Sequence, residues 1–427
     1  MIGAIADDFT GGTDVAMAFR RAGLRTVVVF GEPAEVDLPE HDAIVVALKT
    51  RTIEPGEAVR ASLAAARWLR SKGADQFFFK YCSTFDSRPE GNIGPVADAL
   101  ADLLGAPRTV MVPASPEHLR TQYLGHLFVD RVLLSESPMR HHPLTPMTDS
   151  FIPRVLEGQT SRPVTLVGLV DVQRGRTHLR QQLDRAEAEG ARYVVVDAIT
   201  DSDLVEIGFA CLPDVLVTGA AGLAGGLGVA RFETLRAQGS PPVGPLETDP
   251  VGAVPAAVLA GSCSARTLEQ IAYMQHDHDS YRLDPIATPD SRALADRALS
   301  WVDERSRTTA PLIYSSLPPD ELQRVQDALG VEGASMILET AMGMIATGLV
   351  ERGIRRLVVA GGETSGAVVT ALDVAGGIIG EESAPGVPWI YTTGQQPIAL
   401  LLKSGNFGDP SLLARSVGDQ QLEEVAR

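Results

Sequence analysis

Residues Ile2–Asp14 read IGAIADDFTGGTD and set the pattern for the rest of the chain. The first five of them are apolar or glycine, which predicts a strand Ile2–Ala6 that is covered on both faces. A polar turn follows, and a helical pattern then runs over Asp14–Ala22. A strand that leads through a turn into a helix is the unit of α/β folds. Ligands of open α/β sheets bind beyond the carboxyl ends of the strands, so this turn is a candidate binding site.

The same alternation continues and predicts an α/β fold with mainly parallel sheets. Further strands are predicted at Thr26–Phe30, Ala43–Leu48, Gln76–Tyr81, Thr109–Val112, Val164–Gly168, Tyr193–Val196 and Val215–Val217. Helical patterns lie between several of them, at Pro55–Ser71 and Val172–Glu189. The short Gly- and Ala-rich stretch Val217–Val229 predicts a buried helix.

The segment Gln238–Val251 (QGSPPVGPLETDPV) is rich in proline and glycine and has no periodicity, which is typical of a linker. The alternation then restarts, with strands predicted at Ala256–Ala260, Pro311–Tyr314 and Leu357–Ala360, and helices at Ala265–Gln275 and Gly333–Arg352. We therefore predict two α/β domains, at residues 1–240 and 251–427, joined by a linker at about 238–250.

The chain has 427 residues and a net charge of −17; 44% of its residues are hydrophobic and 21% charged, which excludes wholesale disorder. The pI near 4.9 argues against a nucleic-acid-binding surface. Three scattered cysteines indicate neither a disulfide framework nor a zinc site, and the N-terminus lacks a signal-peptide pattern. No uninterrupted apolar run approaches the roughly 20 residues of a membrane span. We expect a cytoplasmic protein with no membrane or nucleic-acid partner.

The turn after the first predicted strand carries three carboxylates within eight residues, Asp7, Asp8 and Asp14. Adjacent acids at the end of a strand can accept hydrogen bonds from the hydroxyls of a substrate. The structural alternative is a helix N-cap at Thr10 or Thr13, with the acids favoured by the helix dipole. A cap accounts for one acid but not for three, so the pattern favours a binding site.

A second polar loop, Lys80–Asn92 (KYCSTFDSRPEGN), follows a strongly apolar strand and precedes a helical pattern. Lys80 can bind a carboxylate as a point charge, and Asp86 can accept or orient the proton of a hydroxyl. The alternative is an ordinary strand-to-helix loop in which Lys80 and Asp86 pair with each other. The local sequence leaves both interpretations open.

Two histidines, His141 and His142, lie in a proline-punctuated loop, MRHHPLTPMTDS, at Met139–Ser150. A metal site would need further ligands at suitable spacing, and none is visible in the sequence. A structural role is the more common one for such residues, and a hydrogen bond from His142 to a polar substrate remains open.

A glycine-rich turn, Gly361-Gly362-Glu363-Thr364-Ser365-Gly366, stands between a predicted strand and a helix. Glycine lets the backbone approach a ligand closely, and a helix N-terminus offers free N–H groups, which favours a nucleotide phosphate. The spacing fits no standard nucleotide fingerprint, and the alternative is a plain strand-to-helix turn.

We expect two more loops to complete such a site. Gly261–Ser264 (GSCS) follows the strand Ala256–Ala260, and Ser404–Gly408 (SGNFG) follows the apolar run Ile398–Leu402. A serine nucleophile at Ser262 or Ser264 is a competing interpretation, but the sequence has no GxSxG elbow and no histidine or acid can be assigned as its partner.

In this order the segments resemble the four-carbon acid sugar kinase family over nearly the whole chain. The matching stretches are IADDFTG, KYCSTFDS, EGNIGP, GHLFVDRVLLSESPMRHHPLTPMTDS, AGSCS, GGETSGAVV, APGVPW and LLKSGNFGD. The forms KYCSTFDS and HHPLTPMTDS are similar to the 3-oxo-tetronate kinase branch. The chain departs from that branch at Gly12, usually alanine, at Arg88, commonly threonine, and at Thr218–Ala224 (TGAAGLA).

The resemblance implies an N-terminal acid-sugar domain, a C-terminal ATP domain and a substrate cleft between them. It implies phosphorylation of the C4 hydroxyl of a 3-oxo-tetronate, a small four-carbon acid sugar, with ATP and Mg²⁺. By motif, Asp7, Asp8, Lys80, Asp86, Ser87 and Asn92 match the acid-sugar site. Ser262, Ser264, Gly361, Gly362, Glu363, Thr364, Ser365 and Gly405 match the nucleotide site.

We expect Asp86 to activate the hydroxyl, with Asp8 as the second candidate, and leave the metal ligands unassigned. A homo-oligomer remains open. The alternatives are a kinase for D-threonate, D-erythronate or another oxidised sugar acid, and a sugar-acid-binding regulator without turnover. The glycine-rich turn argues against the regulator.

Overall fold

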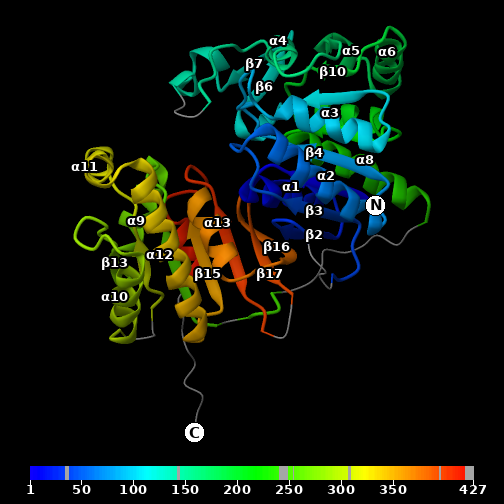
Figure 1. The fold of residues 1–427 in the computed structure, drawn as a ribbon. Coiled ribbons are helices and arrows are strands. Elements are labelled where there is room, and N and C mark those ends of the chain that lie inside the picture. Colours follow the sequence, from blue (N-terminus) through cyan, green and yellow to red (C-terminus); the bar gives the residue numbers. More distant parts are fainter. Residues whose placement is uncertain are drawn as a thin grey trace. The chain divides into compact units, whose positions relative to one another are not determined.

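The computed structural model describes residues 1–33, 38–141, 145–239, 249–252, 254–305, 309–393 and 396–418 (Figure 1). The chain divides into two compact units, Met1–Leu246 and Glu247–Arg427. Their boundary falls inside the segment predicted as a linker, most of which lies outside the described residues.

Unit 1 is built on a parallel sheet with the strand order β2–β3–β1–β4–β11–β5–β10–β9. Its strands are β1 (Ile2–Ala6), β2 (Thr26–Phe30), β3 (Ala43–Ala47), β4 (Gln76–Lys80), β5 (Thr109–Val112), β9 (Val164–Val167), β10 (Tyr193–Val196) and β11 (Leu216–Gly219). A small antiparallel sheet consists of β6 (Arg120–Tyr123), β7 (His126–Val129) and β8 (Val132–Leu133).

Helices cover both faces of the unit 1 sheet, which is why its strands are apolar throughout. They are α1 (Phe9–Arg21), α2 (Pro55–Ser71), α3 (Ile93–Leu104), α4 (Ile152–Glu157), α5 (Leu169–Val172), α6 (Arg176–Ala188), α7 (Asp201–Ala210) and α8 (Ala221–Ala237). In β4, Phe77 and Phe79 belong to the core that α2 and α3 close. Phe78 points to the other face, where its ring lies 6.3 Å from that of Phe19 in α1.

Unit 2 has the strand order β13–β14–β12–β15–β18–β17–β16. The first five strands are parallel, and β17 and β16 add antiparallel pairs. The strands are β12 (Ala256–Ala260), β13 (Ser280–Arg282), β14 (Leu312–Tyr314), β15 (Arg356–Ala360), β16 (Gly376–Ala384), β17 (Val387–Thr392) and β18 (Ala399–Lys403). Two α/β units with mainly parallel sheets confirm the predicted fold class.

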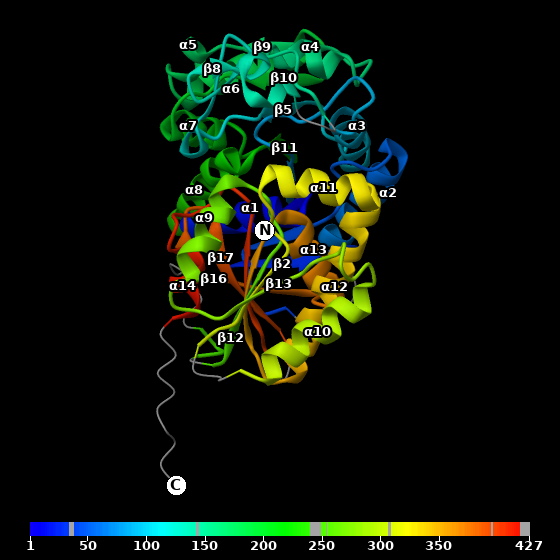
Figure 2. The ribbon, with the colours of Figure 1, turned by 90° about the vertical axis from the view of Figure 1, so that its left-hand side faces the viewer.

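Helices lie on both sides of the unit 2 sheet, α9 and α14 on one and α10, α12 and α13 on the other (Figure 2). The helices are α9 (Ala265–Met274), α10 (Ser291–Asp303), α11 (Pro319–Leu329), α12 (Val331–Glu351), α13 (Gly362–Ala371) and α14 (Leu412–Val417). In the described part of the chain, α12 is the one helix long and apolar enough to cross a membrane. It packs against α10 and α13, as core helices of similar composition also do.

Two predicted segments differ in kind from the structure, and several strands were not predicted. The segment Val172–Glu189 contains parts of two helices rather than one. Gly175, with a φ of +90°, interrupts the helical conformation between α5 and α6. The stretch Val217–Val229 begins inside β11, and helix α8 starts only at Ala221. The antiparallel strands β16 and β17 were not predicted.

Candidate active site

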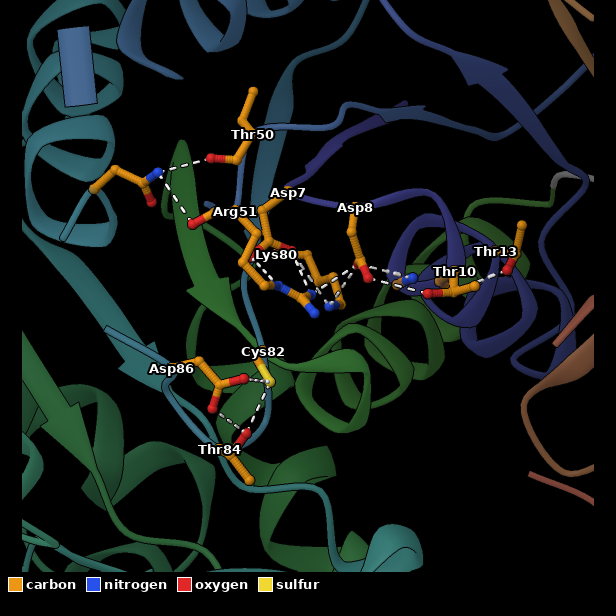
Figure 3. A network of polar contacts seen from close by, with 12 residues as sticks. Asp7, Asp8, Thr10, Thr13, Thr50, Arg51, Lys80, Cys82, Thr84 and Asp86 are labelled. Atoms are coloured by element: carbon orange, nitrogen blue, oxygen red, sulfur yellow. Dashed lines mark hydrogen bonds and ion pairs between the residues drawn. The ribbon is translucent and has the colours of Figure 1, made fainter. Parts of the chain in front are cut away.

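The acid turn after β1 lies beside the ends of two neighbouring strands (Figure 3). Because β1 pairs with β3 on one side and β4 on the other, the residues that follow these parallel strands meet at one edge of the sheet. Asp7 and Asp8 follow β1, and Lys80 is the last residue of β4. Arg51 belongs to the segment that follows β3. These four side chains form the acid cluster.

Arg51 joins the two aspartates through its guanidinium. Its Nε and Nη2 donate to the two carboxylate oxygens of Asp7 at 2.9 and 2.8 Å. Nη2 also donates to Asp8 Oδ1 at 2.8 Å. Two-point binding of a carboxylate by a guanidinium fixes both groups in direction, so the cluster is rigid.

Asp8 has a second role as the N-cap of α1. Its carboxylate accepts hydrogen bonds from the backbone N–H of Gly11 at 2.9 Å and from Thr10 Oγ1 at 3.0 Å. The cap therefore lies at Asp8 and not at Thr10 or Thr13, and the helix begins earlier than the sequence pattern indicates. Asp7 takes no part in this cap.

Lys80 completes the charge balance of the acid cluster. Its Nζ lies 3.6 Å from Asp7 Oδ1 and 3.7 Å from Asp8 Oδ1, and only 5% of its side chain is exposed. A Cβ atom on Gly11 would overlap Lys80 Nζ, so the glycine leaves the space that the ammonium group fills. The contacts of the described residues include no pair between Lys80 and Asp86.

The opposite charges of the acid cluster keep Asp8 and Lys80 ionised. Burial would raise the pKa of Asp8, but Arg51 and Lys80 outweigh it and hold that pKa below 3.8. Burial would lower the pKa of Lys80, but Asp7 and Asp8 outweigh it and raise that pKa above 10.5. The charge of Asp8 therefore stabilises the fold at neutral pH, and this stabilisation is lost as the pH falls through the lowered pKa of Asp8. The charge of Lys80 also stabilises the fold at neutral pH, and this stabilisation is lost as the pH rises through the raised pKa of Lys80. Both groups are therefore charged at neutral pH.

We expect Lys80→Met to lower the free energy of unfolding by about 3–5 kcal/mol, because it leaves the buried Asp7 and the partly buried Asp8 with a single cation. Urea unfolding at pH 7 measures this loss. A variant of unchanged stability that only raises the KM for the acid sugar would contradict the result, and would return Lys80 to the role of a direct carboxylate ligand.

Asp86 lies in the loop between β4 and α3, and two short side chains hold it (Figure 3). Thr84 Oγ1 donates to Asp86 Oδ1 at 2.5 Å, and Cys82 Sγ donates to Oδ2 at 3.2 Å. Burial and the charge of Asp86 raise the pKa of the Cys82 thiol to about 11, so the thiol keeps its proton at neutral pH. Phe85 has a φ of +49° and is buried against Tyr81, which anchors the backbone that carries Asp86.

Asp86 lines a pocket inside unit 1 with an empty volume of about 550 Å³, which includes space open to solvent. The lining residues are Arg51, Thr52, Ile53, Asp86, Ser87, Arg88, Glu90, Gly91, Asn92 and Thr145. The hydroxyl of Ser87 lies where a Cβ atom on Gly91 would be, so this glycine makes room for it. Arg51 belongs both to the pocket and to the acid cluster, which places the two side by side.

Asn92 fixes the segment after β3, which also lines the pocket. Its Nδ2 donates to the carbonyl oxygens of Thr50 at 2.7 Å, and of Arg51 and Ile53 at 3.3 Å each. The amide therefore holds the segment after β3 against the start of α3. His142, the remaining residue predicted to contact the acid sugar, lies outside the described residues.

In unit 2 the three predicted phosphate loops follow adjacent strands. The strand order β12–β15–β18 brings together the ends of the segments that carry Ser262, Gly361 and Gly405. A Cβ atom on Gly405 would overlap Ser262 Oγ. A Cβ atom on Gly361, whose φ is +128°, would lie 3.0 Å from the backbone nitrogen of Ser262. The loops therefore touch one another.

Gly361 precedes α13 and has no side chain to cap it. Gly362 is the first residue of that helix, and a Cβ atom on it would meet nothing within 4 Å. Glu363 is exposed beside it, whereas Thr364 and Ser365 are buried. An uncapped helix N-terminus that faces open space is an arrangement that binds anions such as phosphate.

The hydroxyl groups of the first loop are occupied by structural hydrogen bonds. Ser262 Oγ accepts from the backbone N–H of Ser264 at 3.2 Å, and Ser264 Oγ donates to the carbonyl of Gly405 at 2.7 Å. Within the described part of the chain, neither hydroxyl is bonded to a histidine or an acid. The competing interpretation of a serine nucleophile therefore has no geometric support there.

Lys403, the last residue of β18, holds the Gly405 loop in place through hydrogen bonds. Its buried Nζ donates to the Gly405 carbonyl and to Thr267 Oγ1, both at 3.0 Å, and to Gln270 Oε1 at 2.6 Å. Burial and, secondarily, the charge of Arg266 lower the pKa of Lys403 to about 8. The ammonium group uses its three donors on three acceptors, and a neutral amine has only two.

We expect the affinity for ADP to fall about 2–10-fold between pH 7 and pH 9.5, with a midpoint near pH 8, because a neutral Lys403 can keep only two of the three hydrogen bonds that tie the Gly405 loop to α9. Calorimetric titrations at several pH values measure this. The pKa of Lys403 in the folded protein lies below its ordinary value of 10.5. Between about pH 8 and 10.5 the unfolded chain therefore binds more protons than the folded protein, and the free energy of unfolding rises with pH. The loss of affinity is thus not unfolding. A Lys403→Met variant should lack the midpoint, and a wild-type affinity that stays constant contradicts the prediction.

Two residues that support these sites were not predicted from the sequence. Arg51 follows the apolar strand β3 in the segment Lys49-Thr50-Arg51, the same kind of polar turn that singled out Asp7 and Lys80. That signal could have found it. Lys403 is the final residue of an apolar run, and its role depends on contacts with α9 that no local pattern shows.

Comparisons with known proteins agree with this geometry. A family model described as a sugar-binding N-terminal domain matches residues 2–227, and one described as a nucleotide-binding C-terminal domain matches residues 257–413. The chain is 48% identical over 416 residues to a 3-oxo-tetronate kinase from Burkholderia multivorans, with 96% of this chain and 94% of that protein covered. It is 46% identical over 426 residues to a 3-oxo-tetronate kinase from Pseudomonas fluorescens, with 98% and 96% covered.

A solved structure shows the same fold over the same length. The chain is similar to a protein from Salmonella typhimurium LT2 that was described as a tRNA synthase, with a TM-score of 0.87, 40% identity, and 97% and 98% of the two chains covered. The curated relatives and both family models instead point to a sugar and a nucleotide as the ligands. On the identity of its relatives over nearly its full length, the chain belongs to the four-carbon acid sugar kinase family, a group of carbohydrate kinases.

Proposed function

We propose that the chain transfers the γ-phosphate of ATP to the C4 hydroxyl of a 3-oxo-tetronate. The acid sugar binds at the pocket and acid cluster of unit 1, and ATP binds at the three loops of unit 2. The observation that carries the proposal is that two sets of polar loops lie at strand ends in separate units, in a chain 48% identical to a 3-oxo-tetronate kinase.

In the proposed reaction Asp86 accepts the proton of the C4 hydroxyl while the oxygen of that hydroxyl forms its bond to the γ-phosphorus. The bond between that phosphorus and the β–γ bridging oxygen breaks, and ADP leaves. Thr84 and Cys82 hold the Asp86 carboxylate in one orientation before the substrate arrives. Asp86 is the stronger candidate for this role because the Asp8 carboxylate is already occupied by Arg51, Lys80 and the helix cap.

The loops of unit 2 fit a nucleotide phosphate. The N-terminus of α13 is uncapped, Gly362 faces open space, and Lys403 holds the Gly405 loop in place. Mg²⁺ would neutralise charge on the phosphates, and it commonly keeps several waters and binds through only one or two protein carboxylates. Among the described residues, no three His, Cys, Asp or Glu side chains gather in a metal-binding arrangement.

Measurement of ADP release tests the proposal, with 3-oxo-tetronate, D-threonate and D-erythronate as acceptors. We expect release to require both an acid sugar and Mg²⁺, with the highest kcat/KM for 3-oxo-tetronate. Equal release without any acid sugar contradicts a sugar kinase. A higher kcat/KM for D-threonate or D-erythronate would assign the chain to that acid instead, and tight binding without turnover would indicate a regulator.

A further inference from the structure

One donor group of the unit 1 pocket is fixed in place and has no acceptor. Arg51 uses Nε and Nη2 on Asp7 and Asp8, and its remaining nitrogen, Nη1, has no hydrogen-bond acceptor among the residues that the structure describes. The side chain is 26% exposed and lines the pocket that also holds Asp86. An arginine whose other nitrogens are already bound presents the free N–H groups in one direction, at little further cost in conformational entropy.

The backbone of Arg51 is fixed as firmly as its side chain. Asn92 binds the carbonyl groups of Thr50, Arg51 and Ile53 with one amide group, so the segment cannot move without breaking these hydrogen bonds. A recognition group that is held from both ends before its ligand arrives is typical of a specificity-determining residue.

Three other cations in the described part of the chain lie near the pocket and are less suited to recognise a carboxylate. Arg120, whose charge acts on Asp86, already uses Nη1 on the carbonyl oxygen of His118 at 2.7 Å. The Lys80 ammonium group is buried against Asp7 and Asp8, beneath a glycine that leaves no further room. Arg88 lies on the exposed side of the pocket, and its side chain makes no hydrogen bond or ion pair with the described residues. Ordering that free side chain on a ligand would cost rotamer entropy that Arg51 has already lost.

We infer that Arg51 recognises the C1 carboxylate of the acid sugar and so restricts this kinase to acids over neutral ketoses. The inference rests on the proposed function and names the residue that selects the substrate class. The cluster of two aspartates, Arg51 and Lys80 is neutral as a whole, so the carboxylate is recognised through directed, charged N–H donors and not through a surplus of positive charge.

This arrangement places the two ends of the substrate on opposite loops. The carboxylate end faces the segment after β3, where Arg51 lies, and the terminal hydroxyl faces Asp86 in the loop after β4. A neutral ketose of the same length offers a hydroxymethyl group to Arg51. This group has neither the charge nor the second oxygen of a carboxylate. The ketose keeps the same hydroxyl for Asp86.

Erythrulose is the matched neutral probe, because it has the carbon skeleton of 3-oxo-tetronate with a CH₂OH group in place of the carboxylate. The experiment compares kcat/KM for 3-oxo-tetronate and for erythrulose in the wild-type protein, in Arg51→Gln and in Arg88→Gln. We expect the wild-type preference for the acid to fall roughly 10- to 100-fold in Arg51→Gln, mainly through the KM for the acid, and to stay unchanged in Arg88→Gln.

The ratio of kcat/KM for 3-oxo-tetronate to kcat/KM for erythrulose separates recognition from stability. If Arg51 had a purely structural role, its loss would lower both kcat/KM values together and leave their ratio unchanged. The inference is overturned if this ratio is unchanged in Arg51→Gln, or if it is near one in the wild-type protein. It is also overturned if Arg88→Gln, and not Arg51→Gln, loses the preference for the acid. If Arg51→Gln does not fold, Arg51→Lys keeps the charge balance without the planar fork, and an undiminished ratio there also overturns it. A wild-type protein that phosphorylates no acid sugar refutes the proposed function itself, which is a distinguishable result.

Discussion

The Asp86→Asn variant is expected to lose about 10²–10⁴-fold in kcat and to keep its fold and its affinity for nucleotide. The amide has nearly the same shape as the carboxylate, but it cannot accept the proton of the C4 hydroxyl. The amide oxygen can still accept from Thr84, whereas an NH₂ group in place of Oδ2 cannot accept from Cys82, so the loop keeps part of its support. Steady-state kinetics, a thermal melt and calorimetry with ADP measure the three properties on one preparation.

Thr84→Val is the matched control for this variant. It removes the hydroxyl that orients Asp86 and leaves the carboxylate itself in place, so its loss in kcat should be much smaller than that of Asp86→Asn. If Asp86→Asn is stable and retains near-normal kcat, Asp86 is not the proton acceptor. Asp8 then becomes the candidate to test, as the second carboxylate named by the sequence.

Gly362→Val is expected to abolish measurable binding of ATP and ADP while the chain remains as stable as the wild type. A Cβ atom on Gly362 would meet nothing within 4 Å beyond its chain neighbours and its own helix backbone, so we expect a valine to fit there without strain. This space lies at the uncapped N-terminus of α13, where the phosphates are proposed to bind. Valine also has a better helix propensity than glycine, which works against any loss of stability.

The neighbouring glycine provides the control with the opposite signature. Gly361 has a φ of +128°, and a Cβ atom on it would lie 3.0 Å from the Ser262 backbone nitrogen, so Gly361→Ala should lower the melting temperature. Gly362→Val should change binding without changing stability, and Gly361→Ala should change both. Normal ADP affinity in Gly362→Val would show that the phosphates bind elsewhere.

Much of the fold is local information in this chain. Strands such as β1, β2, β5, β10 and β12 were predicted with their observed limits, because a strand covered on both faces is a short apolar run bounded by polar turns. Alternation with helices then predicts parallel pairing. The missed strands include the antiparallel pair β16 and β17. The sequence of β16 contains charged residues and glycine, and β17 has a proline at its second position, which argues against a strand when it is judged from sequence alone.

The residues of the candidate site were also largely predictable as a set of loops. Polar turns after apolar strands drew attention to Asp7, Lys80 and Asp86, and glycine-rich turns to Gly361 and Gly405. The side-chain partners were not predictable. The sequence left open whether Lys80 forms an ion pair with Asp86. In the structure Lys80 lies instead beside the two aspartates after β1.

The sequence alone therefore determined which turns carry the chemistry, because periodicity and turn composition are properties of neighbouring residues. Tertiary structure decided which turns meet. The order β3–β1–β4 brings Arg51 to Asp7 and Asp8, and the order β12–β15–β18 brings Ser262, Gly361 and Gly405 together. Strand order depends on packing among elements that are far apart in the chain, so no local pattern encodes it. The buried charge balance around Arg51 and the support that Lys403 gives to the Gly405 loop arise only after the sheets have formed.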